Sequence, residues 1–393
     1  CLTTGPLWRI INFIKLPLNG TERLPTVDDL ILRLENIYKS YPNSPAPVLN
    51  GISLSVAQGQ FVTLLGSSGC GKTTTLRIIS GLDAPDRGRV ILAGQDMSHV
   101  PPNARDVNTV FQSYALFPHM TVEQNVGYSL RLRRLPKAEI RQRVREALAM
   151  VQLEGFEKRR PSQLSGGQSQ RVALARSIIS HPRLLLLDEP LSALDYQLRQ
   201  QMQQELKRLQ KQLGISFIYI THDREEALNM SDVIAVMRDG AFEQVGTPEE
   251  VFDSPRTSYV AKFVGGANIL HCHVERVEGQ TAWFQNAQGS GAFSTRGHSF
   301  SPGQNATLAI RPDQAQAEKD FDKSSPGLVG TVKEKSFAGG VLRVAAELSG
   351  GQTFVCSRQG IDWDLDPGDQ IKISWAPEQA CPVDWEALDE KEN

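Results

Sequence analysis

The 393-residue sequence predicts an α/β domain with a mostly parallel sheet, followed by a separate all-β domain. Up to about residue 265, short apolar runs alternate with helix-like segments, which is typical of parallel strands joined by helices. A glycine-rich loop at residues 66–73 stands between one such run and one such segment. Beyond Gly265-Gly266, short β-like runs are separated by Gly, Pro and Asp, which is typical of a barrel-like domain.

The first domain, which we expect at residues 30–265, contains the longer elements. Four consecutive leucines at 184–187 indicate a strand buried on both faces. Gly214 marks the end of a long helix, because glycine readily adopts the left-handed conformation found after helices. The predicted strands are 30–34, 52–56, 60–65, 183–187, 216–220 and 233–237, and the predicted helices are 74–80, 136–160, a helix from about residue 170, and 198–213.

The second domain is expected at residues 266–393. Its β-like runs include 306–310, 342–345 and 370–374, and the polar stretch 315–327 is predicted to be a loop. Residues 1–29 are expected to form a poorly ordered N-terminal extension.

Composition limits the classes of partner. The chain has 42 basic and 44 acidic residues without a block of one sign, so nucleic acid is not an expected partner. No run approaches the roughly 18 apolar residues of a membrane span, so any link to a membrane is expected to go through another protein. Five cysteines at scattered positions favour a reducing compartment over a disulfide framework.

The loop at residues 66–73 predicts a nucleoside triphosphate as ligand. It matches the pattern G-x-x-x-x-G-K-[ST]. Backbone N–H groups of such a loop can surround phosphate oxygens, with the N-terminus of the following helix, at Thr74, facing the same anion. Lys72 would reach the β- and γ-phosphates, and the Thr73 hydroxyl would bind Mg²⁺. The loop residues are Gly66, Ser67, Ser68, Gly69, Cys70, Gly71, Lys72 and Thr73.

Two carboxylates follow the leucine strand. Asp188 and Glu189 stand at its carboxyl end, the edge of a parallel sheet at which ligands bind. Asp188 suits Mg²⁺, directly or through water. Glu189 can orient and deprotonate an attacking water molecule.

A second phosphate-binding loop is predicted at residues 164–168, Leu-Ser-Gly-Gly-Gln. The glycines after Ser165 leave backbone N–H groups open to an anion, and a helix follows. We expect two copies of the chain to pair, each offering Ser165, Gly166, Gly167 and Gln168 to the nucleotide of the other.

Together these motifs resemble the ATP-binding subunits of ABC transporters over about residues 30–265. That family has a RecA-like P-loop core with a helical subdomain, here about 113–170. Its six motifs occur in the family's order: Walker A at 66–73, the Q-loop Gln112, the signature at 164–168, Walker B ending at Asp188-Glu189, the D-loop at 192–195 and the switch histidine His222.

The resemblance implies further roles. Gln112 would sense Mg²⁺ and the attacking water, and His222 would contact the γ-phosphate. Tyr41 matches the aromatic residue that stacks on adenine, with Tyr38 as a nearby alternative. Asp195 would lie at the dimer interface, with a plain helix cap as the alternative. The cofactors implied are ATP and Mg²⁺.

The match is narrower in places. The runs 108–122 and 192–215 resemble importer ATPases, especially those of polyamine (spermidine and putrescine) uptake, and the C-terminal domain resembles the OB-like TOBE domain, with Ile310-Arg311-Pro312-Asp313 as its landmark. The implied partners are a second ATPase subunit, two membrane permeases and an extracytoplasmic substrate-binding protein, with the chain peripheral on the cytoplasmic face of the inner membrane. Ferric iron, sulfate, phosphonate or sugar stay open as substrates, and a soluble ABC ATPase of translation or DNA repair is the alternative class.

Overall fold

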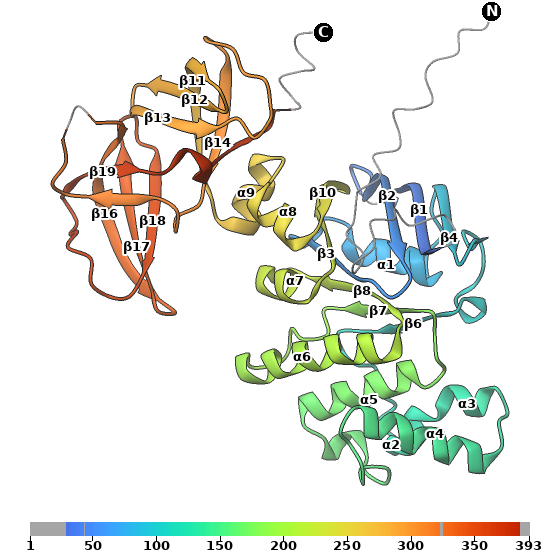
Figure 1. Cartoon of the computed structure of the whole chain (residues 1–393). Coiled ribbons are helices and arrows are strands. Elements are labelled where there is room, and N and C mark those ends of the chain that lie inside the picture. The colour runs from blue at the N-terminus through green and yellow to red at the C-terminus, as the bar shows by residue number, and fades with distance from the viewer. Residues whose placement is uncertain (1–28, 43, 323–324, 386–393) are drawn as a thin grey trace, which may run out of the picture. The chain divides into compact units, whose positions relative to one another are not determined.

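The computed structural model describes residues 29–42, 44–322 and 325–385 (Figure 1). The expected N-terminal extension at 1–29 lies outside the described residues except for Asp29. The chain divides into two compact units, Cys1–Pro248 and Glu249–Asn393. This division assigns the largely helical segment 249–265 to the second unit, whereas the change in sequence pattern places the boundary after residue 265.

The first unit contains two sheets. One is antiparallel and has the order β2-β1-β4-β5, and the other has the order β10-β9-β3-β8-β7-β6. In the second sheet β9, β3, β8, β7 and β6 run parallel, and β10 (Ala241–Gly246) pairs antiparallel with β9. The strands are β1 (Leu30–Lys39), β2 (Leu49–Ala57), β3 (Phe61–Gly66), β4 (Arg87–Leu92), β5 (Gln95–Asp96), β6 (Val107–Val110), β7 (Leu184–Asp188), β8 (Ser216–Thr221) and β9 (Val233–Arg238).

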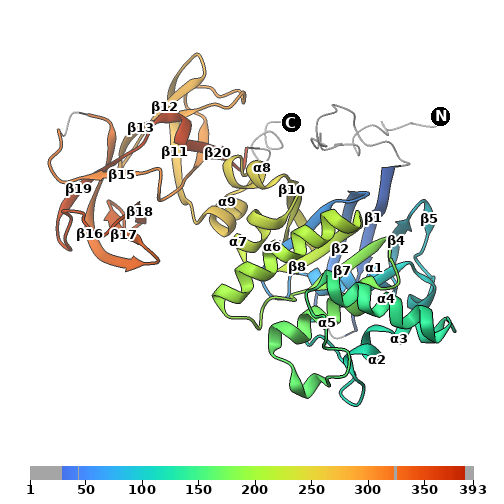
Figure 2. The ribbon, with the colours of Figure 1, turned by 60° about the horizontal axis from the view of Figure 1, so that its bottom comes forward.

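The helices of the first unit are unevenly distributed around its sheets. Figures 1 and 2 show α2 to α5 gathered at one end of the unit, whereas α1 lies near β1, β2 and β4. The helices are α1 (Lys72–Ser80), α2 (Val122–Val126), α3 (Tyr128–Leu132), α4 (Lys137–Met150), α5 (Gly166–Ile178), α6 (Tyr196–Leu213) and α7 (Arg224–Met230).

The parallel sheet separates two apolar cores, and its leucine strand shows how. Leu185 and Leu187 pack in a core with α2, α4, α5 and α6, whereas Leu184 and Leu186 pack in a core with α1 and the antiparallel sheet. Successive side chains of a strand point to opposite faces, so the four leucines fill both cores. The buried strand holds its carboxyl end, and therefore the carboxylates there, in a rigid position.

The second unit is mainly antiparallel sheet. It begins with α8 (Pro248–Asp253) and α9 (Ser258–Gly265), and its strands follow the order β15-β19-β16-β13-β12-β11-β14-β20, with β17 on β16 and β18 on β17. The strands are β11 (Asn268–Glu278), β12 (Thr281–Asn286), β13 (Gly289–Ser294), β14 (Asn305–Ile310), β15 (Gln316–Glu318), β16 (Gly327–Ala338), β17 (Val341–Leu348), β18 (Thr353–Gln359), β19 (Gln370–Ser374) and β20 (Ala380–Val383).

Several expected elements differ from the structure, and the strand predicted at 30–34 extends to Lys39. The helix predicted at 136–160 ends at Met150, and turns follow it. The helix expected from about residue 170 begins at Gly166, because Ser165 caps it. The stretch 315–327 is not all loop, because Gln316–Glu318 pairs with β19, an arrangement that depends on a partner strand far along the chain.

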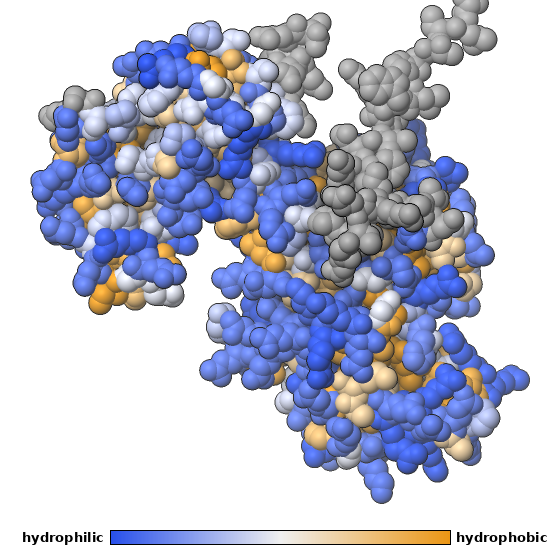
Figure 3. Space-filling view, in the orientation of Figure 1, coloured by the Kyte–Doolittle hydropathy of each residue, from blue (hydrophilic) through white to orange (hydrophobic). Residues whose placement is uncertain are grey.

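The surface is mostly polar. Figure 3 shows hydrophilic residues over most of the visible face, with smaller apolar areas between them. The exposed large apolar side chains among the described residues are Tyr38, Leu82, Phe111, Leu132, Tyr196, Val329, Phe337 and Ile361.

Candidate functional site

Three adjacent parallel strands bring the predicted chemistry to one sheet edge. β3 lies between β9 and β8, and β7 follows β8. Leu65 pairs with Thr221, and Ile220 pairs with Asp188, so the carboxyl ends of β3, β8 and β7 are level. The phosphate loop, the switch histidine and the Walker B carboxylates leave from these ends.

The phosphate loop is shaped by glycines at two crowded points. A Cβ on Gly66 would lie 2.4 Å from the Met237 carbonyl oxygen. Gly71 has a φ of 109° and precedes α1, whose N-terminus it forms. The Lys72 ammonium group is buried inside the loop and donates to the carbonyl oxygens of Gly66 and Ser67, both at 2.8 Å. Phosphate oxygens are stronger acceptors than these carbonyls, so the lysine is placed to bind an anion within the loop.

Thr73 and Asp188 meet beside this lysine. Burial of the Asp188 carboxyl and the nearby Glu189 charge raise the pKa of Asp188, while Lys72 and a hydrogen bond with Thr73 lower it. A hydroxyl and a half-buried carboxyl together are hard oxygen ligands of the kind that Mg²⁺ takes. The two residues therefore fit the metal role predicted for them.

The predicted base and the switch histidine are in contact. His222 Nδ1 lies 3.4 Å from Glu189 Oε1. Glu189 has a φ of 45°, an uncommon conformation for a residue other than glycine, and its N–H donates to the Ile220 carbonyl of β8. That bond continues the parallel pairing of β7 with β8, and the left-handed conformation then turns the chain, with the Glu189 side chain reaching His222 in the loop after β8.

Gln112 lies in the loop after β6 and contacts the loop that follows Glu189. Its amide nitrogen donates to Ser192 Oγ at 3.2 Å, and Ser192 Oγ donates to the Glu189 carbonyl at 2.9 Å. The structure thus links the Q-loop to the D-loop. The contact of Gln112 with Mg²⁺ stays a prediction, because its recorded partner is Ser192.

The signature loop is the start of α5. Ser165 Oγ accepts from the Gln168 N–H, and Gln168 Oε1 accepts from the Ser165 N–H, which is a capping box. Ser165 and Gly166 are exposed and Gly167 is buried, so the start of α5 presents its first residues to solvent. A Cβ on Gly167 would lie 2.9 Å from the Leu198 side chain, so this glycine lets α5 approach α6 closely.

Asp195 caps α6 in the single chain. Its carboxylate accepts from the Leu198 N–H at 3.0 Å. This is the alternative left open by the sequence, and it does not exclude a place at a dimer interface.

Tyr41 lies close to the phosphate-loop helix. Its hydroxyl donates to Asp83 Oδ2 at 2.9 Å, and it also shares a hydrogen bond with Thr74. Burial and the Asp83 carboxylate raise the pKa of this tyrosine. Lys39 Nζ lies 5.4 Å from the centre of the ring. Tyr41 therefore lies beside the start of the helix that follows the phosphate loop, and its stacking on adenine stays a prediction.

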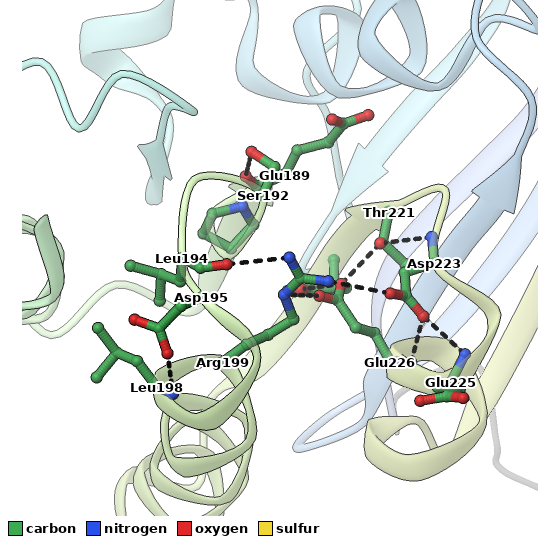
Figure 4. A network of polar contacts seen from close by, with 12 residues as sticks. Glu189, Ser192, Leu194, Asp195, Leu198, Arg199, Thr221, Asp223, Glu225 and Glu226 are labelled. Carbon is green, nitrogen blue, oxygen red and sulfur yellow. Dashed lines mark hydrogen bonds and ion pairs between the residues drawn. The ribbon is translucent and has the colours of Figure 1, made fainter. Parts of the chain in front are cut away.

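Sequence reasoning missed a group of polar residues around the switch loop. Figure 4 shows Arg199 of α6 directed toward Asp223 and Glu226, with Thr221 in the same network. These residues come from segments that carry no phosphate-loop pattern. In the sequence, Arg199 is visible only as a charged residue near the start of the helix that follows the D-loop. Such a residue alone does not indicate a functional role.

Comparison with known proteins gives the family. A family described as ABC transporter matches residues 49–192, and a TOBE domain family matches residues 308–382. The "Spermidine/putrescine import ATP-binding protein PotA" of Escherichia coli K12 is 47% identical over 351 residues, which cover 88% of this chain and 92% of that protein. The chain belongs to the PotA family of ABC transporter ATP-binding proteins. Proteins of the same name from Nitratidesulfovibrio vulgaris and Marinobacter nauticus are each 45% identical, over 88% and 92% of this chain.

Solved structures resemble the ATP-binding part of this PotA family member. The cbiO1 subunit of the cbiONQ ABC transporter complex from Clostridium perfringens has a TM-score of 0.54 at 31% identity, covering 57% of this chain and 92% of its own. The ATP-binding cassette MJ0796, described as dimeric in a post-hydrolysis state with ADP and Pi, has a TM-score of 0.51 at 32% identity, covering 55% of this chain and 98% of its own. In the described part of the present chain, no helix combines the length and apolar character needed to cross a bilayer.

Proposed function

We propose that this chain is the ATP-hydrolysing subunit of an importer that takes up polyamines, spermidine or putrescine. The name shared by the relatives supports the substrate, since their similarity extends over both units. The proposal that the chain hydrolyses ATP is supported by the contact of 3.4 Å between Glu189 and His222, beside the phosphate loop.

The residues divide the chemistry as follows. Lys72 and the loop N–H groups bind the phosphates, and Thr73 and Asp188 would hold Mg²⁺, which when bound would neutralise phosphate charge. The Glu189 carboxylate accepts a proton from water as the water oxygen attacks the γ-phosphorus. The bond from that phosphorus to the β-γ bridging oxygen breaks, and ADP leaves. His222 orients Glu189 and the γ-phosphate.

A second copy would complete each site. Ser165 and Gly166 are exposed at the N-terminus of α5, and Figure 1 places α5 with the helices α2 and α4, away from α1. We propose that two copies enclose two ATP molecules, each with a phosphate loop from one copy and a signature loop from the other. Asp195, exposed beside the signature, would lie at that interface. The remaining partners would be two permease subunits and an extracytoplasmic binding protein, with the chain on the cytoplasmic face of the membrane.

The experiment is ATP hydrolysis by the reconstituted complex of this chain, its permeases and binding protein. Spermidine, putrescine and ferric iron are added in turn. We expect spermidine or putrescine to stimulate turnover and iron to have no effect. Stimulation by iron alone would overturn the substrate, and full-rate hydrolysis by the isolated chain at dilutions where it is monomeric would overturn the shared sites.

A further inference from the structure

The Arg199 guanidinium joins the two loops that carry Glu189 and His222. Nη2 donates to the Leu194 carbonyl at 3.0 Å, within the loop that follows Glu189. Nη1 lies 3.4 Å from Asp223 Oδ2, in the residue after His222. Nε lies 3.9 Å from Glu226 Oε1, too far for a hydrogen bond but close enough for charge attraction. One rigid, planar cation therefore lies between the loop after Glu189 and the start of α7, which follows His222.

One acidic partner of Arg199, Asp223, directly follows His222. The other, Glu226, is bonded to Thr221, which directly precedes His222. Asp223 Oδ1 accepts from the N–H groups of Glu225 and Glu226 and so caps α7. The Asp223 N–H donates to Thr221 Oγ1, and Thr221 Oγ1 donates to Glu226 Oε2 at 2.7 Å. These bonds, some of which Figure 4 shows around Thr221 and Asp223, restrict the backbone on each side of His222.

Glu226 anchors the network in the protein interior. It is buried, and Oε2 also accepts from the Tyr219 hydroxyl at 2.7 Å. Tyr219 is a fully buried residue of β8. Because Glu226 is bonded to a buried residue of a rigid strand, we expect movement of Arg199 to alter the loops and not the sheet.

We propose that Arg199 is a positioning residue for ATP hydrolysis, which holds the loop 189–195 and the loop 221–223 in a fixed relation so that His222 stays within reach of Glu189. This inference rests on the proposed function. Arg199 contacts none of the phosphate-loop or metal residues, so it acts through Glu189 and His222. It also supplies a route by which a partner copy that docks on the loop around Asp195 affects the histidine.

The test measures steady-state ATP hydrolysis by the full chain at saturating ATP, at a temperature where each variant is folded. Arg199→Gln removes the cation and keeps much of the volume. We expect kcat to fall on the order of 10- to 100-fold, with the binding of ATP changed less than about threefold, because geometry is lost and the phosphate loop is intact. Lys207→Gln is the matched control. Lys207 also joins α6 to α7, through the Asn229 carbonyl, but at the far end from the loops, so the rate should stay within about twofold.

The same substitution in a chain that lacks His222 distinguishes an effect on the position of the histidine from a general loss of stability. In a His222→Ala chain, Arg199→Gln should change kcat less than about threefold, because the group it positions is absent. An equal fall in both backgrounds, or an unchanged kcat in the wild-type background, overturns the inference. Should Arg199→Gln not fold, Arg199→Lys decides in the same two backgrounds. A lysine keeps the charge but cannot contact both loops at once, so a smaller loss, about three- to tenfold, is expected and only when His222 is present.

Glu189→Gln in the same assay tests the proposed function separately. If the wild type does not hydrolyse ATP, or if Glu189→Gln hydrolyses it at the wild-type rate, the proposed function fails and the inference with it. If Glu189→Gln is inactive while Arg199→Gln keeps its kcat, the Arg199 inference alone is overturned.

Discussion

The phosphate loop and the pair of loops around Glu189 and His222 lie at the same sheet edge but are built differently. Lys72 finds its acceptors five and six residues away, on the loop itself. Arg199 and Asp223 are 24 residues apart, and Gln112 and Ser192 are 80 apart. A binding loop made by local backbone can be recognised in a short pattern. A hydrolytic arrangement made by long-range contacts depends on how strands and helices pack.

This difference predicts that the largest loss of turnover comes from the long-range part. Glu189→Gln should reduce ATP turnover by about 10²- to 10⁴-fold, because an amide cannot accept the proton of water. ATP binding should persist, so an ATP-bound dimer should accumulate. Steady-state hydrolysis and size-exclusion chromatography with ATP measure the two effects.

Glu154→Gln is the matched control, since Glu154 is exposed in a turn outside the site. It should keep wild-type turnover. Undiminished turnover in the Glu189 variant would show that this glutamate is not the base, and that the loops around Glu189 and His222 do not carry out hydrolysis.

The phosphate loop should respond to backbone strain. At Gly71 an alanine would combine a φ of 109° with a Cβ 2.7 Å from Leu49 Cδ2 and 2.9 Å from the Val48 carbonyl oxygen. We expect Gly71→Ala to lower the free energy of unfolding by about 1–3 kcal/mol and to weaken ATP binding. Urea unfolding and nucleotide titration measure these changes.

Gly94→Ala separates strain from crowding. Gly94 has a φ of 79° but nothing within 4 Å of an added Cβ. It should destabilise the chain less than Gly71→Ala and leave ATP binding unchanged. Equal effects would mean that the close packing around Gly71 contributes nothing.

Substitutions of Asp195 separate its role as the cap of α6 from its proposed role at the dimer interface. Asp195→Ala removes the cap of α6, so the free energy of unfolding should fall by about 1 kcal/mol, as measured by urea unfolding. Asp195→Asn should restore this stability, since its amide oxygen can cap the helix. Loss of ATP-dependent dimerisation in the Asn variant would add an interface role to the cap.

The smallest expected effect concerns the pH dependence of stability through Glu226. Burial raises the pKa of this carboxyl above its usual value of 4.5, and bonds from Tyr219 and Thr221 oppose the rise in part. The folded chain therefore holds this proton at a pH where the unfolded chain has lost it. The contribution of this protonated carboxyl to the free energy of unfolding is fully present below the pKa of the unfolded chain. It is lost as pH rises through the higher pKa of the folded chain.

Glu226→Gln removes this titration while its amide oxygen can still accept both hydrogen bonds. Relative to the variant, the wild type should lose stability as pH rises from below 4.5 through the raised pKa. Urea unfolding at a series of pH values gives the difference. A difference that is constant with pH would show that the carboxyl titrates alike in both states.

The sequence by itself determined the local parts of this protein. Residues 66–73, the leucines before Asp188 and the loop at Ser165 specify their structures through glycine, apolar runs and capping, which act over a few residues. The order of the six motifs also determined the family.

Tertiary structure decided the rest. The pairing of Gln316–Glu318 with β19, the contact of Glu189 with His222 and the position of Arg199 all join segments that are distant in the chain. Such contacts depend on strand order and on which helix faces which loop. No short pattern contains that information, because the free energy that selects one packing comes from the whole core.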